Sequence, residues 1–207
     1  MRWLAPALIG ALCILGLGWP GTRWTSGIGY GVGQTYHDSV RPTGIADERA
    51  YYYPSTGLIR LLAHGSSLWK PGQPFPPYRG ALAGARFAES KEPVAVWDEA
   101  GFFGYFSGSS KTVIDIWGLV DPLLARIPYH PTGAWRIGHY PRRLPAGYRE
   151  TRREGRNLLK DPELAALYDG LVLVTRGPLF TRARWREVWR FNTGYYAPVL
   201  KKQIEGG

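Results

Sequence analysis

The sequence predicts an α/β (or α+β) fold, in which an N-terminal transmembrane helix precedes a compact domain with a small mixed sheet, short helices and long loops. The run Trp3–Trp19 carries no charged residue, and roughly 17–25 such residues can span a bilayer. Short β-branched runs at Val94–Trp97, Thr112–Trp117 and Leu171–Thr175 are typical of buried strands. Helix signals interleave with these runs, which favours a mixed fold.

Composition and charge narrow the class of protein. With 207 residues, 44% of them hydrophobic and 14% aromatic, the chain is too apolar to be disordered and long enough for one domain with its own core. Residues 1–125 hold 10 Lys and Arg against 9 Asp and Glu, whereas residues 126–207 hold 16 against 7. A basic C-terminal part favours a polyanionic neighbour, such as nucleic acid, anionic lipid or a phosphate-bearing substrate, although it is also consistent with a plain solvated surface.

The N-terminus sets the predicted topology. The segment after the apolar run, GWPGTRW, is a poor signal-peptidase site, which favours an uncleaved span over a cleaved leader. Arg2 predicts a cytoplasmic N-terminus. We therefore expect a transmembrane helix or signal anchor at 1–20, a linker at 21–43, a domain outside the cytoplasm at 44–200 and a tail at 201–207.

Capping and turn residues place the remaining elements. Ser55 can cap a short helix at Leu58–Ala63, and the proline-rich segment 70–80 predicts a rigid loop. Asp121 and Pro122 predict a helical turn that buries Leu123, Leu124 and Ile127.

The C-terminal elements follow from similar signals. Residues 128–148 predict a long loop, and residues 162–168 a helix that begins after Asp161 and ends at Gly170. A last helix is expected near 181–191, with Trp185, Val188 and Trp189 on one face and arginines on another.

Carboxylates and the long loop supply the candidate chemistry. Asp98, Asp115 and Asp121 lie in or just after predicted strands, where they could serve acid–base work or only cap and pair. The loop combines His130 and His139 with arginines and aromatic rings, a mixture that suits phosphates and sugars better than a metal. No metal site and no cofactor are predicted, since phosphate-binding glycine loops and a nucleophile elbow are both lacking.

Several segments together resemble a known group of enzymes. The chain resembles the C-terminal extracytoplasmic region of bacterial multi-span (GT-C type) membrane glycosyltransferases similar to terminal arabinofuranosyltransferases. The segments that carry this resemblance are GIADERAYYYPSTGL (44–58), VIDIWGLVDPLLARIP (113–128), WRIGHYPRRLPAGY (135–148), LYDGLVLVTRGPLF (167–180) and RFNTGYY (190–196).

The resemblance implies a membrane location and separate regions for catalysis and for acceptor binding. In such enzymes the transmembrane helices carry the catalytic carboxylate, the donor is a polyprenyl-phosphate sugar, and the C-terminal domain engages the acceptor glycan. Only one apolar span is present here, so the catalytic carboxylate cannot be assigned to any residue of this chain. The resemblance thus implies a single-span protein of the bacterial inner membrane, glycosyltransferase-related but catalytically incomplete alone, whose partner could be a separate multi-span subunit.

The leading hypothesis is a membrane-anchored domain that binds a cell-envelope glycan or a lipid-linked sugar. Aspartates would accept sugar hydroxyls, arginines would contact phosphate, and a second charged patch would precede the tyrosines at 51–53. The predicted substrate-binding residues are Asp115, Asp121, Arg126, Trp135, Arg136, His139, Arg142, Asp47, Glu48 and Arg49.

Two alternatives remain open. The arginines Arg182, Arg184, Arg186 and Arg190 on one helix could track the phosphates of a nucleic acid. A membrane span opposes that reading, because the domain would face away from DNA, and no nucleic-acid partner is expected. A small glycoside hydrolase that uses Asp115 and Asp121 would need the two carboxyl groups about 5–5.5 Å apart for a retaining mechanism.

Overall fold

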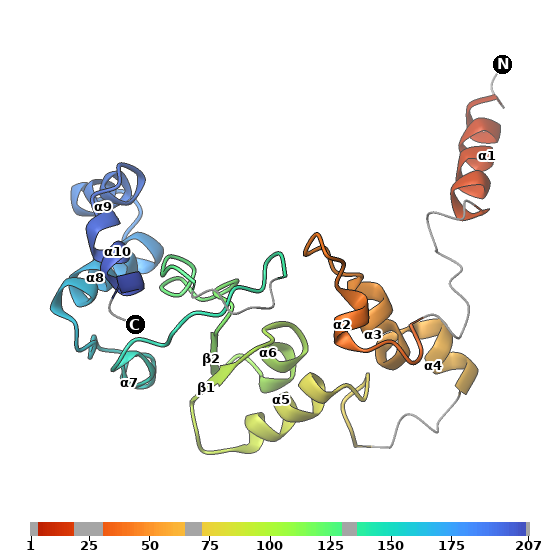
Figure 1. Cartoon of the computed structure of the whole chain (residues 1–207), viewed down its shortest axis with the longest axis horizontal. Helices are drawn as coiled ribbons and strands as arrows, with labels where there is room; N and C mark the ends of the chain where they lie inside the picture. Colours follow the sequence, from red (N-terminus) through yellow and green to blue (C-terminus); the bar gives the residue numbers. More distant parts are fainter. Residues whose placement is uncertain (1–3, 19–30, 65–71, 130–135, 206–207) are drawn as a thin grey trace. The chain divides into compact units, whose positions relative to one another are not determined.

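Residues 4–18, 31–64, 72–129 and 136–205 are described by the computed structural model. Contacts divide the chain into two compact units. Unit 1 comprises residues 1–39 and 47–70, and unit 2 comprises residues 40–46 and 71–207. Figure 1 shows the elements of both units along the chain.

Unit 1 is helical throughout its described elements. It contains α1 (Leu4–Gly18), α2 (Tyr36–Ser39), α3 (Glu48–Thr56) and α4 (Leu58–His64). The Asp47 carboxylate accepts the Ala50 N–H at 3.0 Å and so caps α3. The predicted helix at Leu58–Ala63 is confirmed as α4, but Ser55 lies inside α3 and does not cap it.

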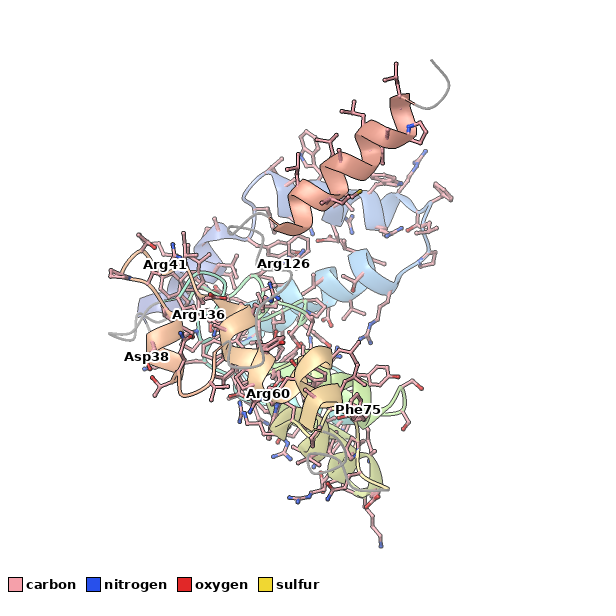
Figure 2. All side chains as sticks on the ribbon, turned by 90° about the vertical axis from the view of Figure 1, so that its right-hand side faces the viewer. Asp38, Arg41, Arg60, Phe75, Arg126 and Arg136 are labelled. Atoms are coloured by element: carbon pink, nitrogen blue, oxygen red, sulfur yellow. The ribbon has the colours of Figure 1, made fainter. Side chains whose placement is uncertain are left out.

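Helix α1 exposes large aliphatic side chains along its length (Figure 2). Leu8 is 63% exposed, Leu12 60% and Ile14 71%. Among the described residues, no helix combines the length and the apolarity that crossing a membrane requires.

Unit 2 contains a two-stranded parallel sheet. β1 (Val94–Trp97) pairs with β2 (Thr112–Asp115) so that Val94 lies opposite Thr112. The connection is α6 (Gly101–Ser107), which packs against α5 (Arg79–Glu89). Figure 1 shows both helices in yellow and green beside the sheet.

Small and aromatic residues join the sheet to its helices. A Cβ at Gly84 would lie 2.4 Å from the Phe103 carbonyl oxygen, so only glycine allows α5 to approach α6 this closely. The Phe103 ring stacks on Trp97 with ring centroids 4.3 Å apart, and on Phe87 at 5.6 Å.

The C-terminal helices complete unit 2. They are α7 (Tyr148–Glu154), α8 (Pro162–Arg176), α9 (Arg182–Asn192) and α10 (Ala197–Glu205). One buried cluster unites the strands with these helices. Its members include Val94, Ile114, Leu123, Leu124, Ile127, Tyr148, Leu164, Leu167 and Leu171. The predicted burial of Leu123, Leu124 and Ile127 is thus confirmed.

The region around Gly170 corrects two predictions. The predicted strand Leu171–Thr175 is wrong, because these residues continue α8 to Arg176. Gly170 does not end the helix. A Cβ there would lie 2.7 Å from the Tyr196 hydroxyl oxygen and 2.9 Å from Glu187 Oε2, so this glycine lets α9 and the following segment pack on α8.

Other boundaries differ less. The second strand ends at Asp115 and not at Trp117, since Asp115 turns the backbone into a loop. The last predicted helix, 181–191, corresponds to α9. The predicted long loop, 128–148, is free of helix and strand at 128–129 and 136–147, and its last residue, Tyr148, begins α7. The mixed helix-and-strand class is confirmed, but the sheet in the described residues is parallel and not mixed. Helices α2, α3, α5, α6, α7 and α10 were not predicted.

Candidate anion-binding pocket

Asp115 anchors a loop at the end of β2. Its side chain is 1% exposed. Oδ1 accepts the Trp117 N–H at 3.0 Å, while Oδ2 accepts the N–H groups of Leu119 and Val120 at 2.7 and 3.2 Å. A buried carboxylate needs such donors, and three backbone amides supply them. Sugar binding by Asp115 stays a prediction, and the contacts observed are those of a loop anchor.

Asp121 caps the next turn and is 2% exposed. Its Oδ1 accepts the N–H groups of Leu123 and Leu124 at 3.0 and 2.9 Å. The Tyr148 hydroxyl donates to the carboxylate and lies 2.9 Å from each oxygen. Burial raises the pKa of Tyr148, and the Asp121 carboxylate adds to the shift, so the phenol stays protonated and donates. The predicted cap is confirmed.

Arg142 and Arg126 bind carbonyl groups of their own chain. Arg142 donates from Nε to the Ile127 carbonyl at 3.2 Å and from Nη1 to the Trp117 carbonyl at 2.7 Å. Arg126 donates to the Pro122 carbonyl at 2.8 Å, and its guanidinium lies 5.2 Å from the centroid of Phe191. Both arginines therefore tie loop segments to the core, and phosphate contacts by them stay predictions.

Arg136 and His139 lie beside the same loop. Arg136 is 7% exposed, and its carbonyl accepts the His139 N–H at 3.0 Å. The His139 ring lies 5.4 Å from the Trp117 ring. Burial lowers the pKa of His139, and Arg136 acts in the same direction, so the imidazole is neutral at pH 7. The structure thus gathers Asp115, His139 and Arg142 around Trp117.

The remaining predicted site residues lie apart from this group or outside the described ranges. Trp135 and His130 fall outside the described residues. Asp47, Glu48 and Arg49 belong to unit 1, where Asp47 caps α3 and the Arg49 guanidinium lies 5.9 Å from the centroid of the Tyr53 ring.

A pocket of about 180 Å³ opens elsewhere in unit 2. It lies between the start of β2, α7, the turn that follows α7, and α8. Three arginines and one aspartate give its lining a formal charge of +2. The lining residues are Thr112, Thr151, Arg152, Gly155, Arg156, Asn157, Tyr168, Asp169, Val172 and Arg176. Sequence analysis did not single out this site.

Arg152 is the innermost charged group of the pocket. Within the described residues its Nε is buried without a hydrogen-bond partner. Burial acts to lower the pKa of Arg152, but the neighbouring Tyr148, Tyr168 and Asp121 outweigh it, so the pKa lies above its ordinary value. A charged guanidinium with a buried, unused donor is expensive to maintain, and it marks a position where an anion would add stability.

The Arg152 side chain also connects the pocket with a predicted residue. Tyr148, which donates to Asp121, lies beside Arg152, and its ring packs edge-on against Tyr168 with centroids 5.7 Å apart. Asp121 therefore does not line the pocket, but it holds Tyr148, which lies next to Arg152.

Two further arginines lie at the rim. Arg156 pairs with Glu154 at 2.8 Å. Arg176, at the end of α8, makes no hydrogen bond or ion pair within the described part of the chain. Asn157 donates to the Ala165 carbonyl and to Asp169 Oδ1, each at 2.8 Å, which fixes the floor between α7 and α8.

The arrangement is suited to binding an anion. Guanidinium groups hold phosphate oxygens with forked, charge-assisted hydrogen bonds. The volume of about 180 Å³ is smaller than the roughly 300–1,000 Å³ of pockets for drug-sized ligands, so it suits one headgroup of a larger molecule. Among the described residues no group of three His, Cys, Asp or Glu side chains is placed to hold a metal ion.

Comparison with known proteins gives a family. A model described as a domain of unknown function (DUF8728) matches residues 78–203, more than half of the chain. The chain belongs to the DUF8728 family. The DUF8728 region begins at Tyr78, the residue before α5, and contains the sheet, the buried cluster and every residue of the pocket. Comparison with curated proteins and with solved structures gave no match.

One sequence signal could have indicated the pocket. The segment RETRREGRN at 149–157 places Arg152 and Arg156 four residues apart around a helix end at Gly155. Gly155 has φ +70°, a left-handed backbone that ends α7 and turns the chain. Arg176, from α8, could not be joined to this segment without knowing that α8 extends past Gly170.

Proposed function

We propose that this DUF8728 protein is a membrane-anchored binding domain for a phosphate-linked sugar of the cell envelope. In this proposal it is related to the C-terminal region of multi-span glycosyltransferases and is not catalytically complete alone. One observation carries the proposal: the pocket lined by Arg152, Arg156 and Arg176, in which a buried guanidinium nitrogen has no partner among the described residues.

The pocket favours a phosphate over a carboxylate or a neutral sugar. Three arginines against Asp169 give the lining a formal excess of two positive charges, one of which Glu154 offsets by pairing with Arg156. A phosphate monoester carries about −1.5 to −2 near pH 7. A diester linkage between lipid and sugar carries a smaller negative charge, which matches the remaining excess more closely. Tyr168 and Asp169 at the same pocket supply oxygen atoms of the kind that bind sugar hydroxyls.

Helix α1 supports the proposed anchor. Its exposed aliphatic side chains would be stabilised by an apolar solvent. Fifteen helical residues extend about 22 Å, against about 30 Å for the hydrocarbon core. The proposal therefore includes the apolar residues that flank α1 in the run Trp3–Trp19, with unit 2 on the extracytoplasmic side.

The other functions receive less support from the described contacts. Asp115 and Asp121 accept hydrogen bonds from backbone amides and Tyr148, which are the contacts of structural carboxylates and not those of a hydrolytic pair. The nucleic-acid alternative rests on the basic C-terminal part of the chain and on the arginines of α9.

Titration with farnesyl phosphate, a soluble polyprenyl phosphate, tests the proposal. We expect the full chain in detergent to bind it, and Arg176→Gln to weaken binding about tenfold by removing one charge-assisted contact. Isothermal titration calorimetry provides the affinities, with farnesol as the uncharged probe.

A matched variant controls for net charge. Arg86 is an exposed arginine of α5 outside the pocket, so Arg86→Gln should leave the affinity unchanged. Equal losses in the two variants, equal binding of farnesol, or no binding at all would each refute the proposed site.

A further inference from the structure

Helix α9 presents a mixed tryptophan and arginine face to solvent. At 100° per residue, Arg182, Trp185, Arg186 and Trp189 fall within one arc of about 100°. All four are exposed, Trp185 to 58% and Trp189 to 70%. Arg182 and Arg186 therefore share one face with the tryptophans, whereas the sequence had predicted a separate face for them.

The opposite side of α9 explains this orientation. Glu187 is 5% exposed and accepts the Tyr196 hydroxyl at 2.6 Å and Arg190 at 2.8 Å. Arg184 donates to the Val174 carbonyl at 3.0 Å. Because these polar contacts bind α9 to α8 and to the following segment, the two indoles are left outside the core.

The loop before α9 extends the same region. Leu179 is 59% exposed and Phe180 is 89% exposed. They lie between the end of α8 and Thr181, whose hydroxyl caps α9 by accepting the Arg184 N–H at 3.3 Å. We name the set Leu179, Phe180, Arg182, Trp185, Arg186 and Trp189 the α9 surface.

We propose that the α9 surface docks on an anionic lipid bilayer. Indoles combine a large apolar body with one donor and are stable at the boundary between headgroups and acyl chains. Arginines among them complement lipid phosphates, each contributing to attraction towards an anionic surface. Leu179 and Phe180 would enter the acyl region beside them.

The composition of the α9 surface favours lipid over single-stranded nucleic acid. Both ligands attract arginine and tryptophan, since bases stack on indoles. Leu179, however, has no aromatic face on which a base could stack, and its exposed side chain is most readily explained by an apolar solvent. Nucleic-acid binding is therefore the competing outcome of the test.

This docking rests on the membrane location proposed for α1 but not on the ligand of the arginine pocket. Unit 2 would then contact the bilayer by its own surface, in addition to the tether. If the protein binds farnesyl phosphate but does not dock on lipid, only the inference about the α9 surface is overturned. If it docks on lipid but does not bind farnesyl phosphate, only the ligand proposed for the pocket is overturned.

The test is vesicle flotation of a variant in which apolar side chains of α1, the proposed membrane anchor, are replaced. The full chain with Leu8, Ile9, Leu12 and Leu15 replaced by Gln should float with phosphatidylcholine vesicles that contain phosphatidylglycerol. Pure phosphatidylcholine should bind it more weakly. Adding Trp185→Ser and Trp189→Ser should reduce partitioning about tenfold, since two interfacial anchors are lost.

Controls separate docking from unspecific effects. Tyr105, on α6, is 80% exposed, so Tyr105→Ser should leave flotation unchanged, and circular dichroism should report native helix content in every variant. Flotation that persists after both tryptophan substitutions would overturn the proposal. So would a complete lack of flotation, including the case in which the chain instead binds an oligothymidylate.

As a second measurement, the unsubstituted chain bound to the same vesicles can be footprinted with hydroxyl radicals. Trp185 and Trp189 should be oxidised less on these vesicles than on vesicles of pure phosphatidylcholine. The oxidation of Tyr105 should be the same on both. Equal oxidation of the tryptophans in both lipids would contradict docking by the α9 surface.

Discussion

Single carboxylates in unit 2 stabilise turns, and their positions explain why sequence reasoning found them. Asp115 and Asp121 were singled out because a carboxylate beside a buried strand is unfavourable unless paired. Both are indeed buried and fully supplied with donors, yet the donors are backbone amides and Tyr148. Sequence identifies a carboxylate that needs partners, but it does not reveal whether a ligand or the chain provides them.

Asp121→Ala should destabilise the protein. The substitution leaves the Leu123 and Leu124 amides and the buried Tyr148 hydroxyl without their acceptor. Buried groups left unpaired cost roughly 1–3 kcal/mol, so we expect the free energy of unfolding to fall by about 2–3 kcal/mol. Urea denaturation measures it. Asp98→Ala, which removes only the exposed pair with Arg79, is the control and should change stability by less than about 1 kcal/mol.

Tyr196 should make the protein sensitive to alkali. Burial, together with Glu187, raises the pKa of Tyr196 to about 12 from an ordinary 10.0. Because the folded state favours the neutral phenol, this stabilisation is present below pH 10 and is lost as the pH rises towards 12. Tyr196→Phe should therefore be less stable than the parent at pH 8, and the difference should shrink between pH 10 and 12.

Urea midpoints measured across that range check this dependence. Tyr195→Phe, at the exposed neighbouring ring, should follow the parent at every pH. A constant gap between Tyr196→Phe and the parent from pH 8 to 12 would contradict the assigned role of the phenol.

At the scale of elements, α8 shows where local signals fail. A glycine after an apolar run favours a helix end, and the β-branched Leu171–Thr175 favours a strand. Tertiary packing outweighs both preferences, because only a glycine at position 170 leaves room for the Tyr196 and Glu187 side chains to pack against α8. Helices α5 and α6 were missed for a related reason, since each contains two glycines, which lower helix propensity. Helix α7 was missed because it has only seven residues.

Gly170→Ala tests this packing. A methyl group would lie 2.7 Å from the Tyr196 hydroxyl oxygen, and overpacking typically costs about 1–3 kcal/mol. Alanine regains up to about 1 kcal/mol of helix propensity, so we expect a net loss of about 1–2 kcal/mol in the free energy of unfolding.

Gly104→Ala is the matched control for that substitution. A Cβ at Gly104, in α6, would meet nothing within 4 Å, so the same exchange should be neutral or stabilising. Thermal denaturation of the two variants gives the comparison, and equal effects would show that propensity alone determines both.

For the whole molecule, the mixed fold class and the basic C-terminal part could be predicted from the composition and from the spacing of hydrophobic residues. The pocket did not follow, because Arg152 and Arg176 lie on separate helices and meet only in the folded unit. The α9 surface was half predicted: the helix was expected, but Glu187, a buried acid, determines which side faces inward, and burial of a charged residue is not what a hydrophobic pattern predicts.

The start of the family match at Tyr78 has a consequence for inheritance. The arginine pocket and the α9 surface both lie in the shared segment, whereas α1 lies outside it. Recombination upstream of this segment would therefore exchange α1 and retain both proposed binding surfaces. The proposed pocket and the proposed lipid contact would then be inherited together, whatever segment precedes Tyr78.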